Sequence, residues 1–186
     1  ITIDKTSGLP SNSVYDIFQD SKGFMWFATG KGLCRYDGND FKLFTADFQT
    51  SKSGSCIAED KYGRIWYANF DGFLYYVEKG CLKALPQETS LGYFRFGIIN
   101  NELFLIQPEA ILVYDLKSLK VKAKHVINDK EVRFCYATKE KFYVLGNYLY
   151  ELGNKNEIKK YKLPEDFYSE IITPIINTFY QKFIIN

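Results

Sequence analysis

Apolar residues occur along this chain in short runs separated by polar turns. In the first 45 residues the runs occupy 13–18, 24–29, 33–36 and 41–45. Between the first two runs lies Asp20-Ser21-Lys22-Gly23, which is typical of a tight turn because glycine accepts a positive φ and aspartate can bond its own backbone. No window shows a sustained period of 3.6 residues, so we expect no helix of consequence. The pattern predicts four short antiparallel strands joined by hairpins.

The same pattern recurs further along the chain. Residues 17–36 and 57–76 align at a spacing of 40 residues, and fainter copies of the apolar rhythm follow at spacings of 38 and 39 residues. Four antiparallel strands with a period near 40 are typical of a β-propeller blade. We take the residues shared by the first two copies as the structural signature of the repeat. They are Asp20, Gly23, Trp26, Gly32 and Tyr36 in the first copy and Asp60, Gly63, Trp66, Gly72 and Tyr76 in the second.

The predicted fold is therefore all-β, a partial β-propeller over residues 1–186 built from blades of four antiparallel strands. Residues 1–10 could supply the strand that closes the last blade. Because propellers close with whole blades and the chain does not divide into a whole number of them, we expect a fragment of a larger propeller of the seven-bladed type. The expected blades occupy 11–46, 53–85, 93–126 and 132–162, with a partial fifth at 168–186.

Two kinds of strand are expected within a blade. Phe24–Ala28 is apolar on both faces, as a strand between neighbouring blades should be. Trp26 and Trp66 would then fill the wedge between blades, although the same side chains could also be platforms for sugar stacking. In residues 119–125, lysines alternate with smaller or apolar residues, which indicates a half-exposed outer strand whose edge is protected by charge.

Composition agrees with this fold and narrows the partners. The chain is 46% hydrophobic, 18% aromatic and 25% charged, which favours a globular domain rich in strands. A net charge of +2 predicts neither a nucleic acid nor an anionic membrane as partner. No uncharged apolar run approaches the ~18–20 residues that span a bilayer, so we expect no membrane contact by this segment.

Few residues suggest catalysis. His125 is the only histidine, and it lies on the expected outer strand without a neighbouring catalytic motif. Asp20 and Asp60 could form an acid–base pair, but equivalent turns on adjacent blades have no reason to converge on one substrate, so we interpret them as turn formers. We predict no catalytic residue, no metal site and no cofactor.

The four cysteines have no spacing typical of a zinc site, and we expect small buried side chains. Three disulfide pairings remain open for them. They are Cys34, Cys56, Cys81 and Cys135.

The sequence does not assign ligand-binding residues. Propellers bind ligands at the rim of the central channel or on one face, where loop side chains gather. The side chains that could reach such a surface are Arg35, Tyr93, Arg95, Arg133 and Tyr136.

Residues 8–38 resemble the two-component regulator propeller repeat. The resemblance lies in Gly8-Leu9, Asn12, Val14, the Asp20-x-x-Gly23 turn, Trp26, Thr29, Gly32-Leu33 and Tyr36-Asp37-Gly38. Ala28 stands where many members have glycine. The second copy keeps the turn and the tryptophan but has Tyr76-Val77-Glu78 in place of Tyr-Asp-Gly, and the later copies keep only the apolar rhythm.

This resemblance implies the periplasmic sensor region of a hybrid two-component histidine kinase of the Bacteroides type. Such a region would bind an oligosaccharide and act with the rest of its own kinase, and the full-length protein could be a homodimer. Two alternatives remain open because a propeller fold does not fix a function. One is a scaffold that holds another protein, and the other is a propeller enzyme such as a lyase or a glycosidase.

Overall fold

Four sheets make up the chain as the computed structural model describes it, over residues 4–86, 96–107, 109–129, 131–132, 134–153 and 157–167. Each sheet has four antiparallel strands, and each strand pairs with its neighbour in the sequence. This is the meander of a propeller blade, so the predicted fold class is confirmed. The expected partial blade at 168–186 lies outside the described residues.

The blades follow the chain in order. The first contains β1 (Val14–Gln19), β2 (Met25–Thr29), β3 (Gly32–Tyr36) and β4 (Phe41–Phe44). The second contains β5 (Gly54–Glu59), β6 (Ile65–Asn69), β7 (Leu74–Glu78) and β8 (Cys81–Ala84). The third contains β9 (Phe96–Ile99), β10 (Glu102–Gln107), β11 (Ala110–Asp115) and β12 (Lys120–Val126). The fourth contains β13 (Phe134–Ala137), β14 (Lys141–Leu145), β15 (Tyr148–Gly153) and β16 (Ile158–Lys162).

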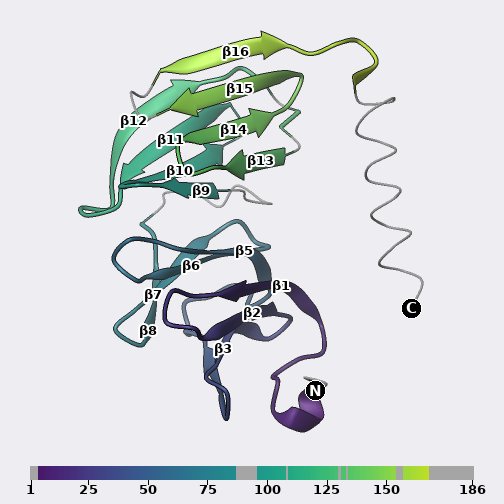
Figure 1. Cartoon of the computed structure of the whole chain (residues 1–186), viewed down its shortest axis with the longest axis vertical. Coiled ribbons are helices and arrows are strands. Elements are labelled where there is room, and N and C mark those ends of the chain that lie inside the picture. Colours follow the sequence, from purple (N-terminus) through teal and green to yellow (C-terminus); the bar gives the residue numbers. More distant parts are fainter. Residues whose placement is uncertain are drawn as a thin grey trace.

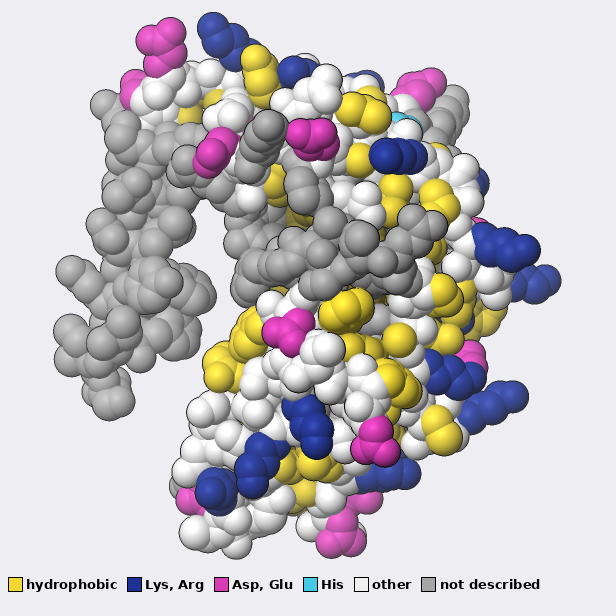
Figure 2. All heavy atoms as spheres, turned by 180° about the vertical axis from the view of Figure 1, so that it is seen from behind, with side chains coloured by type: hydrophobic (Ala, Val, Ile, Leu, Met, Phe, Trp, Pro, Cys, Tyr) yellow, Lys and Arg dark blue, Asp and Glu magenta, His cyan; other side chains and the backbone are white. Residues whose placement is uncertain are grey.

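The first strands of neighbouring blades contact one another, β1 with β5, β5 with β9 and β9 with β13, so the blades follow an arc (Figure 1). The fourth strands lie at the outer end of each blade, and their lysines are exposed on β8, β12 and β16. In Figure 2, Lys and Arg side chains gather along the right-hand margin, the side on which β8 and β12 lie in the reversed view. The half-exposed outer strand expected at 119–125 is β12.

The closing strand expected in residues 1–10 lies partly outside the described residues. Residues 1–3 lie outside the described part, and the rest of the segment contains the short 3-10 helix η1 (Lys5–Ser7). The Asp4 carboxylate accepts hydrogen bonds from the backbone N–H groups of Thr6 and Ser7, which favours a turn over an extended strand.

The register of the first two blades differs by one residue after the hairpin that joins their second and third strands. Trp26 lies opposite Arg35, whereas Trp66 lies opposite Tyr76. The reason is the hairpin, which spans 29–32 in the first blade and the longer stretch 69–73 in the second. The equivalence that the sequence predicts between Tyr36 and Tyr76 is therefore wrong, because the counterpart of Tyr76 is Arg35.

Hydrophobic clusters fill the space between blades. Trp26, Ala28 and Phe44 of the first blade pack with Ile65 and Val77 of the second. In the same way, Trp66 and its neighbours on β6 and β7 pack against the third blade. Trp26 is 3% exposed and Trp66 is 0% exposed, so neither ring has a face open for sugar stacking.

Candidate functional site

An aspartate in each of the first two blades binds both a turn and a tryptophan. The Asp20 Oδ1 atom accepts hydrogen bonds from the backbone N–H groups of Lys22 and Phe24, at 3.0 and 2.9 Å. Its Oδ2 atom accepts a hydrogen bond from the indole Nε1 of Trp26 at 2.7 Å. The turn is completed by Gly23, whose φ of 88° is the left-handed conformation that glycine adopts without strain.

The second blade repeats this arrangement around Asp60, which accepts from two backbone N–H groups and, at 2.8 Å, from the Trp66 indole. The two aspartates serve separate turns and do not form a pair. The sequence predicts their role in the turns but not their bond to the indole. The shared Asp-x5-Trp spacing was the only signal of that bond.

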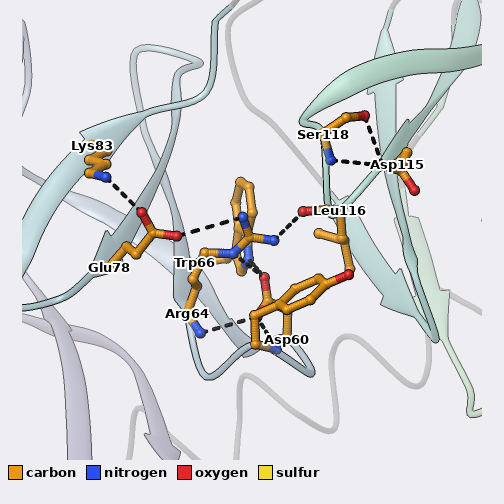
Figure 3. A network of polar contacts seen from close by, with 9 residues as sticks. Asp60, Arg64, Trp66, Glu78, Lys83, Asp115, Leu116 and Ser118 are labelled. Atoms are coloured by element: carbon orange, nitrogen blue, oxygen red, sulfur yellow. Dashed lines mark hydrogen bonds and ion pairs between the residues drawn. The ribbon is translucent and has the colours of Figure 1, made fainter.

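We call the interface between two neighbouring blades a seam. In the seam between the second and third blades, Arg64 forms a bridge from one blade to the other (Figure 3). Its Nε atom donates to Asp60 Oδ2 at 2.6 Å, and its Nη2 atom donates across the seam to the carbonyl oxygen of Leu116 at 2.5 Å. Its Nη1 atom lies 4.0 Å from Glu78, which accepts from Lys83 at 2.6 Å. Arg64 is 4% exposed, and these acceptors compensate the cost of burying its charge.

The seam between the first and second blades has no such arginine bridge at the corresponding position, and we call it the open seam; the one bridged by Arg64 is the closed seam. The counterpart of Arg64 is Phe24, which cannot reach across with a hydrogen bond. A cavity of about 160 Å³ lies there, which we call the seam pocket. Its lining includes Lys22, Phe24, Trp26 and Arg35 of the first blade and Ile65 and Lys79 of the second.

Arg35 is the half-buried cation of the seam pocket. Its guanidinium lies over the Phe24 ring, with Cζ 4.4 Å from the ring centroid. Its Nε atom is buried and has no hydrogen-bond partner among the described residues. A buried donor without an acceptor costs free energy, so Arg35 is not fully compensated within the described part of the chain.

The two carboxylates in the seam pocket already have donors. Asp20 accepts the three hydrogen bonds of its turn, and the Glu59 carboxylate accepts from the backbone N–H and the hydroxyl of Ser21, both at 2.7 Å. The second pair of bonds crosses the seam. Lys22 and Lys79, by contrast, are exposed and form no ion pair within the described part of the chain.

Other residues singled out from the sequence lie apart from the seam pocket. Tyr136 is 60% exposed on β13, while Tyr93, Arg95 and Arg133 lie outside the described residues. His125 lies on β12, where burial lowers its pKa from the usual value for histidine.

The four cysteines are free thiols. Cys34 is buried, and this burial raises the pKa of its thiol to about 11. The expected burial is correct for Cys34 but not for the other three, because Cys56 and Cys135 are half-buried and Cys81 is exposed. Among the residues with described positions, no three His, Cys, Asp or Glu side chains are grouped as a metal site would need. Over the same residues, no helix has the length and apolar character to cross a bilayer.

The first Asp–Trp turn lies in a segment that matches a known family. Residues 8–31 match the family model described as Two component regulator propeller. This segment is therefore similar to a two component regulator propeller repeat. The matched segment, which we call the regulator propeller repeat, includes Asp20, Lys22, Phe24 and Trp26 of the seam pocket and ends before Arg35. No curated protein matches the chain in sequence.

Solved structures share the fold beyond this repeat. Virginiamycin B lyase from Staphylococcus aureus has a TM-score of 0.65 at 16% identity, and the match covers 84% of this chain and 58% of the lyase. The extracellular domain of BT3049, assigned to the hybrid two component systems of B. thetaiotaomicron, has a TM-score of 0.62 at 18% identity, covering 87% of this chain and 26% of that domain. The corresponding domain of BT4673 has a TM-score of 0.64 at 15% identity, covering 84% and 25%.

This chain thus spans only part of the length of each of these structures. At these identities the likeness establishes the propeller fold and leaves the function to be argued from the residues.

Proposed function

We propose that this chain is a ligand-binding part of the extracytoplasmic sensor of a hybrid two-component histidine kinase. The observation that carries the proposal is the regulator propeller repeat at 8–31, set in a run of blades whose fold is also that of two extracellular domains from B. thetaiotaomicron. The chain would then be periplasmic, and its partners would be an oligosaccharide and the rest of its own kinase. The full-length protein could act as a homodimer.

A sensor of this kind must respond to its ligand by a change of arrangement. A ligand shifts an equilibrium only by the difference in its affinity for the two states. The seams between blades are suitable places for such a difference, because hydrogen bonds between side chains on one blade and backbone groups on the next fix the relative positions of the blades. Asp16 gives one example, since its Oδ2 atom accepts from the backbone N–H of Ile57 at 2.7 Å.

The proposal assigns binding and no catalysis to this segment. Virginiamycin B lyase has a TM-score of 0.65, but at 16% identity it shares the fold alone. A propeller can also hold another protein, and that scaffold role is the alternative which the experiment below separates from ligand sensing.

The test is calorimetric titration of the natural extracytoplasmic region that contains this chain with a panel of oligosaccharides from different polysaccharides. We expect saturable heat and a rise in Tm with oligosaccharides of one polysaccharide and no response to the others. A panel without any response, together with recovery of a stable protein partner in a pull-down, would replace the sensor proposal by the scaffold.

A further inference from the structure

We propose that the seam pocket between the first and second blades binds a single acidic group, the carboxylate or sulfate of an acidic sugar. That the ligand is a sugar rests on the proposed function. That the bound group is acidic rests on the geometry and charge of the pocket. The pocket is about 160 Å³, whereas pockets that enclose drug-sized ligands measure roughly 300–1,000 Å³. A cavity of this size accommodates one charged group and leaves the rest of a ligand on the surface.

Arg35 supplies the recognition chemistry. A guanidinium is a planar fork of donors that matches the paired oxygens of a carboxylate or a sulfate. The Phe24 ring, 4.4 Å from the guanidinium carbon, holds this fork in one orientation before any ligand arrives. The Nε atom is buried, so the terminal Nη groups of this half-buried side chain, which form no hydrogen bond within the described residues, are the donors that an oxygen atom of the ligand would reach.

The charges around the pocket favour an anion over a cation. Lys22 and Lys79 add two positive groups beside Arg35, and none of the three forms an ion pair within the described residues. Asp20 and Glu59 also line the pocket, held in place by hydrogen bonds from fixed donors, so the lining has three basic and two acidic side chains and a net positive charge. Asp37 lies close enough to Arg35 for the two charges to interact, yet its pKa is lowered chiefly by the backbone N–H groups of its own turn.

In the seam between the second and third blades, the chain itself supplies the acceptors for the arginine. There Arg64 uses Asp60 and the Leu116 carbonyl as its acceptors, so an external anion would find no free donor. The first seam has a guanidinium at the same level but on the adjacent strand. There Asp20 is the counterpart of Asp60, but Arg35 forms no hydrogen bond with it and has no carbonyl acceptor like that of Leu116 among the described residues. An acidic ligand would therefore give Arg35 acceptor oxygens, as Asp60 and the Leu116 carbonyl give them to Arg64.

The two tryptophans provide a direct measurement. The chain has 2 Trp, and both indole N–H groups donate to an aspartate, at 2.7 Å for Trp26 and 2.8 Å for Trp66. Each gives a separate indole signal in an ¹⁵N–¹H NMR spectrum, one beside the seam pocket and one in the closed seam. We would titrate the 186-residue chain with glucuronate and N-acetylglucosamine 6-sulfate, with glucose and N-acetylglucosamine as neutral controls, and with sodium sulfate.

The expected result is a saturable shift of the Trp26 signal with the acidic sugars only, while the Trp66 signal stays in place. Arg35→Gln should weaken this binding at least about tenfold, the loss of roughly one charge-assisted hydrogen bond. Lys31→Gln removes one exposed charge from the opposite hairpin of the same blade and should leave the binding unchanged. Higher salt should weaken the binding because exposed Lys22 and Lys79 contribute to it.

Several outcomes would overturn the proposal. Neutral sugars could shift Trp26 as strongly as acidic ones, Arg35→Gln could bind as tightly as the original chain, or sodium sulfate alone could bind, which would make the ligand a free inorganic anion. If oligosaccharides bind the extracytoplasmic region but acidic sugars leave Trp26 unmoved, this inference fails and the sensor proposal stands. If no sugar of any kind binds in either experiment, the sensor proposal fails as well.

Discussion

The two seams on either side of the second blade share the same turn but differ in the contacts that cross them. In both, an aspartate in a tight turn accepts a hydrogen bond from a buried tryptophan. The residue two positions before the tryptophan then decides the outcome, because Arg64 bridges to the third blade whereas Phe24 leaves a cavity. A repeat can therefore keep its folding signature constant and still vary the chemistry between its blades.

The comparison predicts, first, that the two aspartates differ in their contribution to stability. Asp60→Ala should destabilise the chain by about 3–5 kcal/mol, because it leaves the charge of buried Arg64 without its partner. Asp20→Ala should cost only about 1–3 kcal/mol, because the groups it leaves unpaired are neutral N–H donors. Urea denaturation of both variants measures the difference. Equal losses would mean that the ion pair between Asp60 and Arg64 adds nothing to stability.

A second variant converts the closed seam toward the open one. Arg64→Phe removes the hydrogen bond to the Leu116 carbonyl and leaves Asp60 with its tryptophan and turn donors, as Asp20 has in the first blade. We expect a loss of about 1.5–3 kcal/mol, the value of a hydrogen bond to a charged group. The measurement is again urea denaturation, and Lys61→Gln, an exposed lysine on the same turn, is the control. A stability equal to that of the control would show that the bridge is dispensable.

The open seam should depend less on its own bridging contacts. Ser21→Ala removes the hydroxyl that donates to Glu59 at 2.7 Å but keeps the backbone N–H that donates to the same carboxylate. The expected loss is about 0.5–1.5 kcal/mol, the net value of one ordinary hydrogen bond. Thermal unfolding of Ser21→Ala beside Arg64→Phe tests the ranking, and a larger loss for Ser21→Ala would reverse it.

The smallest expected effect is a pH dependence confined to the closed seam. The hydrogen bond from Lys83, aided by the charges of Lys83 and Arg64, lowers the pKa of Glu78 below its usual 4.5. Because the folded pKa is the lower one, Glu78 stabilises the fold above about pH 4.5, and this stabilisation is lost as the pH falls through the folded pKa.

Glu78→Gln should therefore have a slightly lower Tm than the original chain at pH 7, and the gap should close as the pH falls below about 4.5. The gap stays small because the Glu78 side chain is 33% exposed and its partner Lys83 is more exposed still, so solvent weakens the interaction of their charges. A gap that is the same at pH 7 and pH 3 would contradict this role for Glu78.

Much of the fold was accessible from the sequence because each blade is a local structure. Glycine and aspartate define the turns, alternating or continuous apolar residues distinguish outer from inner strands, and the spacing of 40 residues repeats the unit. The position of Asp20 and Asp60 six residues before a tryptophan was visible as well. Its meaning was not, because a hydrogen bond to the indole depends on where the turn places the carboxylate.

The tertiary structure alone decided the register after the hairpins, the partner of Arg64 and the existence of the seam pocket. The alignment of the two sequence copies pairs Tyr36 with Tyr76. Because the hairpin of the second blade is longer, the residue of the first blade that is structurally equivalent to Tyr76 is Arg35. Arg64 needs an acceptor that lies 52 residues away in the sequence, on another blade. Local rules determine turns and strands because their interactions are between near neighbours, whereas a seam forms between residues that only the packing of whole blades brings together.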